Sequence, residues 1–163
     1  MEKAALEISL STPADYPGLV EIDHLVWNIE TTPAPDIRWE SPEDYGKQFP
    51  AGSQIVARCN GKVCGYIFYK DVFPVPSNLH VADLAMAVHP DYHGQNIGFE
   101  LMRAVEELAR DNGKTKLSLR VLSTNEKAIR FYKKCGYQVQ GRLVGEFYLN
   151  GRFVDDLLFY KHI

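Results

Sequence analysis

The sequence predicts one domain of the α/β (α+β) class, spanning residues 1–163, in which helices cover both faces of a mixed sheet. Of the 163 residues 45% are hydrophobic, which is enough for a single buried core. Two Asn-Gly pairs each separate β-prone runs, as is typical of hairpins. The other runs show strand or helix periodicity, and the predicted order is βααβββαβαββ. Such an order suits a sheet packed against helices.

The first part of the chain predicts one strand and two helices. Residues 5–10 alternate apolar and polar side chains, which indicates a strand. The Ser-Thr pair at residues 11–12 offers either side chain as a cap for a helix that begins at Pro13 and reaches Trp27. Ser41 caps a second, shorter helix. The first helix is expected to bury Leu19, Ile22, Leu25 and Val26.

The predicted strands follow from turn chemistry and alternation. An Asn-Gly pair tolerates positive φ at both positions and therefore favours a tight hairpin turn. Single strands are expected at residues 79–88 and 116–121. The two predicted hairpins pair residues 53–59 with 62–70 around Asn60-Gly61, and residues 137–149 with 152–160 around Asn150-Gly151.

Two further helices carry clear local signals. A helix begins near Asn96 and ends at Gly113. Ser123, with Glu126 three residues later, matches a capping box for a helix that stops at Gly136. The first of these helices places Ile97, Leu101, Val105 and Leu108 on one face.

The composition excludes several partners and sites. A net charge of −3 argues against nucleic acid as the main partner. No apolar run approaches the ~20 residues of a membrane helix, and the start of the chain lacks a signal-peptide pattern. The cysteines, Cys59, Cys64 and Cys135, are odd in number and lack metal-ligand spacing. We therefore expect no metal, no membrane partner and reduced thiols in the cytoplasm.

The turn from Val88 to Gly98 is the strongest candidate binding element. It joins a predicted strand to the first turn of a helix, where main-chain N–H groups have no partner within the helix. The helix dipole adds positive potential there, so a diphosphate is a suitable ligand. The glycine patterns of the Rossmann and Walker loops are absent. The alternative is a strand-to-helix turn that binds nothing.

This turn resembles the acetyl-CoA pyrophosphate loop of the GCN5-related N-acetyltransferase (GNAT) superfamily. The family pattern is Arg/Gln-x-x-Gly-x-Gly/Ala, and His93, Asn96 and Gly98 stand at its defined positions. Gly98 fits, whereas His93 replaces Arg or Gln and Asn96 replaces Gly. The segment from Asn125 to Gly136 independently resembles the family's Asn-x-x-Ala-x-x-Phe-Tyr pattern and its following glycine. The two segments cover roughly the C-terminal half of the chain.

The resemblance implies a GNAT-like fold with a largely antiparallel sheet and acetyl-CoA as co-substrate. It implies an N-acetyltransferase in which a primary amine attacks the thioester directly, through a tetrahedral intermediate. Main-chain N–H groups after His93 would hold the diphosphate, and an N–H near Ala87 or Val88 would polarise the thioester carbonyl. The cofactor-binding residues implied are Ala87, Val88, His93, Gly94, Gln95, Asn96, Ile97, Gly98, Asn125 and Tyr132.

Three residues are candidates for proton transfer. Tyr132 stands where the family's tyrosine protonates the departing thiolate, and a phenol with a pKa near ~10 is protonated at neutral pH. Asp83 and His80 lie in the region where the family often places its general base. Tyr132 and Asp83, and also Asn125, each have a structural alternative. Tyr132 could simply pack its ring, Asp83 could serve only as a hydrogen-bonding group, and Asn125 could be a helix cap.

The acceptor stays open between a small-molecule amine and a protein amine. Trp27, Trp39 and Tyr45 either line the acceptor site or pack the edge of the core. The hairpin over residues 137–160 either closes over the acceptor or forms a homodimer interface. The alternative function, from another class, is a non-catalytic acyl-CoA-binding or sensing module.

Overall fold

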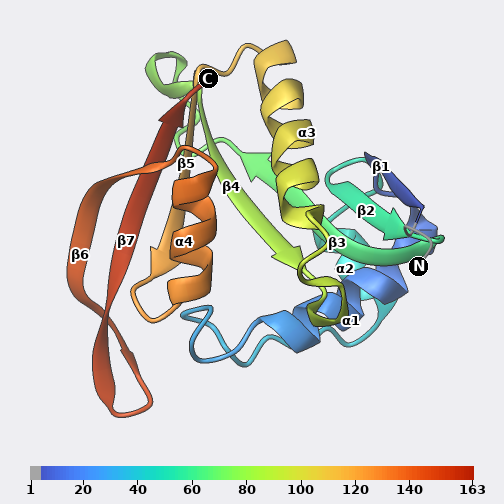
Figure 1. Ribbon diagram of the computed structural model, residues 1–163, viewed down its shortest axis with the longest axis horizontal. Coiled ribbons are helices and arrows are strands. Elements are labelled where there is room, and N and C mark those ends of the chain that lie inside the picture. Colours follow the sequence, from blue (N-terminus) through green and yellow to red (C-terminus); the bar gives the residue numbers. More distant parts are fainter. Residues whose placement is uncertain (1–4) are drawn as a thin grey trace. The chain divides into compact units, whose positions relative to one another are not determined.

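The computed structural model describes residues 5–163, and its elements follow the predicted order (Figure 1). Within these residues one sheet has the strand order β1-β2-β3-β4-β5-β7-β6. β4 and β5 pair in parallel, and the β1–β2, β2–β3, β5–β7 and β6–β7 pairs are antiparallel. The predicted mixed, largely antiparallel sheet is therefore confirmed. The strands are β1 (Leu6–Leu10), β2 (Ile55–Cys59), β3 (Lys62–Lys70), β4 (Val81–Val88), β5 (Lys116–Leu122), β6 (Gln138–Leu149) and β7 (Arg152–His162).

The chain divides into two compact units, which are described separately. The first contains the described residues up to Val26, together with Ile37–Tyr69 and Ala85–Leu108. The second contains Trp27–Asp36, Lys70–Leu84 and Ala109–Ile163. A single domain over residues 1–163 stays a prediction. The helices are α1 (Tyr16–Val26), α2 (Pro42–Gln48), α3 (Ile97–Asp111) and α4 (Glu126–Lys134).

The core of the first unit comes from α1, α2, α3 and the β2–β3 hairpin. The turn of this hairpin has positive φ at Asn60 (52°) and Gly61 (81°), as its sequence predicts. Along α3, Ile97, Leu101 and Val105 are buried as expected, and Leu108 is half-buried. The fully buried side chains of this unit include Leu19, Ile22, Tyr45, Val56, Ile67, Leu101 and Val105.

Two predictions for the first helix are wrong. A separate 3₁₀ turn covers Pro13–Asp15, because the Asp15 carboxylate turns back to accept the Thr12 N–H at 2.8 Å. The inward face of α1 then carries Leu19, Ile22 and a buried Asp23. Leu25 is 49% exposed, because two residues beyond Asp23 correspond to about 200° around a helix.

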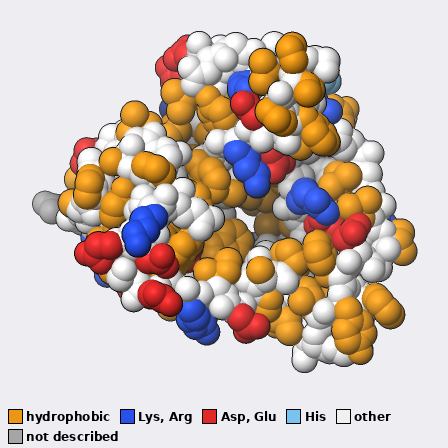
Figure 2. Space-filling model, turned by 180° about the vertical axis from the view of Figure 1, so that it is seen from behind, with side chains coloured by type: hydrophobic (Ala, Val, Ile, Leu, Met, Phe, Trp, Pro, Cys, Tyr) orange, Lys and Arg blue, Asp and Glu red, His pale blue; other side chains and the backbone are white. Residues whose placement is uncertain are grey.

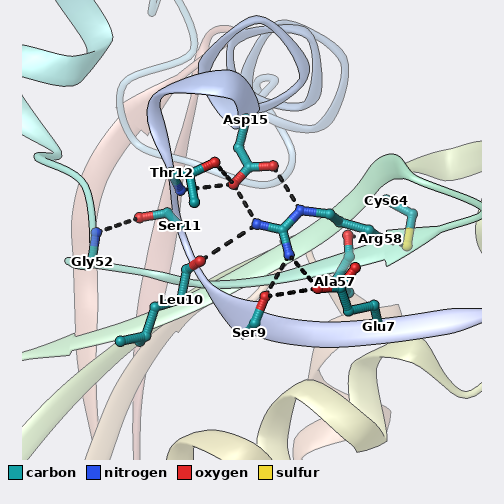
Figure 3. Close-up of polar contacts among 10 residues, drawn as sticks. All are labelled: Glu7, Ser9, Leu10, Ser11, Thr12, Asp15, Gly52, Ala57, Arg58 and Cys64. Carbon is teal, nitrogen blue, oxygen red and sulfur yellow. Dashed lines mark hydrogen bonds and ion pairs between the residues drawn. The ribbon is translucent and has the colours of Figure 1, made fainter.

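A nearly buried ion pair stabilises the first unit (Figure 3). Arg58 on β2 donates from Nε to one oxygen of Asp15 at 2.8 Å and from Nη2 to the other. Its Nη1 donates to Ser9 on β1 at 2.6 Å. Burial raises the pKa of Asp15, but Arg58 and the Thr12 N–H outweigh it and leave that pKa below its usual value. Removing either partner would leave a charge with little access to water.

The second unit is built on β5, α4 and the long β6–β7 ribbon (Figure 1). The turn of the ribbon has positive φ at Asn150 (51°) and Gly151 (78°), which confirms the second predicted hairpin. Ser123 does not cap α4, because its N–H extends the ladder to the Asp155 carbonyl at 2.9 Å. Asn125 is the cap instead, since its Oδ1 accepts the Ala128 N–H at 3.3 Å.

An irregularity interrupts the β6–β7 ladder. Leu143 pairs with Asp156 and Phe147 with Val154, so β6 has two extra residues between these pairs. The Asp155 carboxylate fills the gap by accepting from the Gly145 N–H at 2.7 Å and from Arg142 Nη1 at 2.6 Å. The ladder is thus locally replaced by contacts to one side chain.

One face of the protein carries charges of both signs. On the face shown in Figure 2, Lys and Arg side chains alternate with Asp and Glu side chains among hydrophobic ones. None of the helices in residues 5–163 is both long and apolar enough to cross a membrane.

Candidate active site

The 93–98 loop, comprising His93 to Gly98, lies in the first unit. It follows a 3₁₀ turn after β4 and includes the first two residues of α3. Gly94 has φ of 83° and Asn96 has φ of 60°, so left-handed residues occur twice within three positions. Residues 93–96 are exposed, and a Cβ placed on Gly94 would meet no heavy atom within 4 Å. Such alternation aims successive N–H groups into a concave anion site.

The main-chain N–H groups of residues 94–98 are available to a ligand. Among the described residues, no hydrogen bond is donated by these five groups. The first bond recorded at the start of α3 runs from the Glu100 N–H to the Asn96 carbonyl at 3.1 Å. Unpaired donors at a helix start fit a diphosphate. The helix begins one residue later than expected, at Ile97.

The His93 side chain turns toward the end of β4. Its Nε2 lies 3.3 Å from the Val88 carbonyl oxygen, and its ring is exposed. That contact requires a protonated ring nitrogen, so Nε2 is the donor. One ring nitrogen is therefore engaged by the protein itself.

Two residues that the sequence did not single out position this loop. A Cβ on Gly65 of β3 would lie 3.0 Å from Leu101, 3.1 Å from the Ala87 carbonyl oxygen and 3.3 Å from Ile97. A side chain here would push on the start of α3 and on the Ala87 backbone, so glycine favours their close packing on the sheet. A glycine inside a β-prone run is the sequence signal that could have identified it.

His89 is the second positioning residue, and it is 3% exposed. Its N–H donates to the Cys64 carbonyl at 2.8 Å, and its Nδ1 accepts the Asp91 N–H at 3.1 Å. Its Nε2 lies 3.5 Å from a carboxylate oxygen of Glu21 on α1. These contacts tie the turn that precedes the loop to β3 and α1. The histidine beside Pro90 was a visible signal, but its burial depends on tertiary packing.

Asp83 and His80 lie in the second unit and differ in their surroundings. Asp83 on β4 is half-buried and accepts a hydrogen bond from Ser118 Oγ at 2.9 Å. Burial raises the pKa of its carboxyl group above the ordinary value, against the opposing effects of Ser118 and nearby cations. His80 is exposed and precedes β4. The Asp83 carboxylate thus binds a proton more strongly than an ordinary aspartate, as a general base must.

Tyr132 lies on α4, with its ring half-buried against aromatic neighbours. The ring centroids of Tyr137 and Phe159 lie 6.1 and 6.5 Å away. Among the described residues its hydroxyl has no hydrogen-bond partner. Burial, and then the nearby Cys135 thiol, raise its pKa. The phenol therefore stays protonated at neutral pH, as a proton donor must be.

The three aromatic residues that were candidates for the acceptor site differ in burial. Tyr45 is fully buried, and its hydroxyl exchanges hydrogen bonds with Gln54, so it belongs to the core. Trp39 is half-buried and donates from Nε1 to the Asp23 carboxylate at 2.8 Å. Trp27 is half-buried in the second unit. Within residues 5–163 no cluster of three or more His, Cys, Asp or Glu side chains could hold a metal ion.

Comparison with known proteins gives the family context. A spermidine N(1)-acetyltransferase from Escherichia coli is 32% identical over 105 residues, which cover 61% of this chain and 53% of that protein. The chain thus matches about half the length of that relative. The L-amino acid N-acyltransferase MnaT of Escherichia coli is 26% identical over 159 residues, covering 92% of this chain and 90% of MnaT.

Solved structures share the fold. The crystal structure of smu.2055 from Streptococcus mutans superposes with a TM-score of 0.87 at 28% identity, covering 96% of this chain and 98% of that one. The yncA acetyltransferase of Salmonella typhimurium, solved with acetyl-CoA, has a TM-score of 0.81 at 20% identity, covering 97% and 94%. The model of the acetyltransferase (GNAT) family matches residues 20–137. Because that match spans most of the sequence, this chain belongs to the acetyltransferase (GNAT) family, whose enzymes use acetyl-CoA.

Proposed function

We propose that this chain is an acetyl-CoA-dependent N-acetyltransferase that acts on a primary amine by direct attack. The observation that carries the proposal is the 93–98 loop, where left-handed Gly94 and Asn96 precede the first turn of α3. The free N–H groups of residues 94–98 would hold the diphosphate of the co-substrate. Family membership supports this assignment.

Each proton in the proposed reaction has a donor or an acceptor. Asp83 takes a proton from the attacking amine, directly or through water, because only the uncharged nitrogen can attack the thioester. An N–H near Ala87 or Val88 stabilises the oxyanion of the tetrahedral intermediate. Tyr132 gives its proton to the departing sulfur. Asn125 is proposed to contact the co-substrate with its amide NH₂ group, since its Oδ1 already caps α4.

The acceptor is proposed to be a small-molecule or protein amine. Relatives are named for spermidine and for L-amino acids, and both compounds carry primary amines. The cysteines are free thiols, which supports a cytoplasmic location as part of the same proposal.

A homodimer through the β6–β7 hairpin is also proposed. Val144, Tyr148 and Phe153 are 81%, 66% and 73% exposed. Three such exposed hydrophobic side chains on one hairpin are typical of an interface. Light scattering should give twice the 18.5 kDa chain mass, and Val144→Glu should shift it to the monomer. A monomeric wild type at micromolar concentration would rule the dimer out.

The decisive experiment measures thiol release from acetyl-CoA with a panel of amines: spermidine, several L-amino acids and a peptide with a free N-terminus. We expect release with at least one amine, and its loss in Tyr132→Phe. Calorimetry with coenzyme A runs in parallel. Binding without release on any amine would favour a sensing module, whereas no binding at all would contradict both functions.

A further inference from the structure

Two thiols of the first unit lie in direct contact. Cys59 is the last residue of β2 and Cys64 is the third residue of β3, on opposite sides of the Asn60-Gly61 turn. Their sulfur atoms are 2.9 Å apart. A disulfide bond is about 2.05 Å long, so the two atoms need to approach by only roughly 0.9 Å to bond. Both residues are buried, with exposures of 4% and 0%.

A register shift in the hairpin produces this contact. Arg58 pairs with Val63, and the next pair joins Ala57 to Gly65, so Cys64 has no residue opposite it. Figure 3 shows Cys64 on β3 beside Ala57 and Arg58 of β2. The Cys64 sulfur also lies 3.4 Å from the Ala57 carbonyl oxygen. A residue outside the regular pairing can adjust without breaking the ladder on either side.

A metal ion is a poor occupant for this pair. Zinc and other thiophilic ions in structural sites need about four ligands. Within residues 5–163 no third His, Cys, Asp or Glu joins two others to form such a group. The two sulfurs therefore have each other as their reaction partner.

We propose that Cys59 and Cys64 form an oxidation site that closes to an intramolecular disulfide when the chain meets a peroxide. One thiolate attacks a peroxide oxygen, forming an S–O bond and breaking the O–O bond, and the released hydroxide becomes water. The second sulfur then attacks the resulting sulfenic acid, forming the S–S bond and releasing hydroxide. That hydroxide takes the second thiol proton, so two thiols and one H₂O₂ give one disulfide and two waters.

The environment decides which sulfur reacts first. Burial raises the pKa of the Cys64 thiol, and the neighbouring Cys59 raises it further. Cys64 is thus a poor first nucleophile, because only a thiolate attacks readily. The first attack belongs to Cys59, beside the exposed turn, and Cys64 completes the bond by proximity.

The test counts free thiols. Folded wild-type protein is treated with hydrogen peroxide, unfolded without reductant and labelled with N-ethylmaleimide, and its mass is measured. Reduced protein should take three labels, one for each cysteine, and oxidised protein should take one. A peptide map of the wild type should link Cys59 to Cys64, and dithiothreitol should restore all three labels.

Variants separate this pair from the third cysteine. Cys135→Ser should still lose two labels on oxidation, whereas Cys59→Ala and Cys64→Ala should form no internal link. The wild-type peptide map keeps the test valid if an alanine variant fails to fold. Retention of three labels after peroxide treatment, or a link that involves Cys135, would overturn the proposal.

Discussion

The 93–98 loop is proposed to bind the co-substrate, whereas Asp83 and Tyr132 are proposed to transfer protons. The two regions use different chemical groups of the chain. The loop, in the first unit, offers main-chain N–H groups arranged by backbone angles. The second unit offers single side-chain atoms, a carboxylate and a phenol, whose pKa values are both raised by burial. On the proposed function, this difference accounts for the departures from the family pattern at His93 and Asn96. A backbone site tolerates new side chains as long as the angles survive, whereas a phenol has no substitute.

The largest effect on activity is expected at Tyr132. Tyr132→Phe removes the acid for the leaving sulfur, and kcat should fall by about 100-fold or more, as for other general acids. KM for acetyl-CoA should change little, because the variant keeps the aromatic ring and its contacts with Tyr137 and Phe159. Steady-state thiol release measures both constants. Tyr160→Phe makes the same chemical change on β7 and should be silent. A kcat within threefold of wild type would exclude Tyr132 as the acid.

Asp83→Asn should lower kcat by roughly tenfold, since water can take the amine proton less well than a carboxylate. Because the folded-state pKa of Asp83 is raised, its ionised form favours unfolding. Its contribution to stability is full below the ordinary carboxyl pKa of about 3.9 and is lost as pH rises through the folded value. The variant should therefore lose activity at neutral pH while keeping or raising Tm.

Activity against pH separates the two base candidates. Wild-type kcat/KM should fall on the acidic side with a pKa above the ordinary carboxyl value, and that limb should vanish in Asp83→Asn. His80→Gln, at an exposed position, should keep it. Loss of the limb in His80→Gln alone would assign the base to His80.

In the 93–98 loop, Asn96→Ala should raise KM for acetyl-CoA by roughly fivefold. Alanine in the left-handed region costs about 1 kcal/mol more than asparagine, and the loop must supply that energy to present its N–H groups. Asn96→Gly keeps the conformation and removes the same side chain, so its KM should stay near the wild-type value. An equal rise in both variants would show that the Asn96 side chain itself binds the ligand.

The smallest effect is expected for His93→Ala, which should change KM by less than about twofold at pH 7.5, because main-chain donors dominate the site. A drop in affinity of tenfold, measured by calorimetry with coenzyme A, would instead make the imidazole a phosphate ligand. The loop would then bind its ligand through a side chain, as Asp83 and Tyr132 are proposed to act through theirs.

Local rules predicted most elements, because their causes lie within a few residues. Asn60-Gly61 and Asn150-Gly151 specify tight turns by backbone freedom alone. Ser41 caps α2 by accepting the Asp44 N–H three residues later. The 93–98 loop was found in the same way, from a strand end and a helix start.

The errors arose where distant residues compete. Ser123 fits a capping box, but pairing with β7 takes its N–H, and Asn125 caps α4 instead. Leu25 fits a helical stripe, but the buried contacts of Asp23 with Trp39 and Tyr66 set the rotation of α1. Gly65 matters because α3 packs on it. A glycine within a β-prone run signals a close approach, but only the fold shows that α3 is the element that approaches.

The gap filled by Asp155 also bears on aggregation. β6 stands last in the strand order of residues 5–163, so within this part of the chain one side of it has no neighbouring strand. An exposed sheet edge can pair with strands from other chains and thereby start insoluble fibrils. The two additional residues between Leu143 and Phe147 break the even spacing that a recruited strand would need. We therefore expect the Asp155 carboxylate, which accepts from Arg142 and the Gly145 N–H, to hinder pairing along this edge.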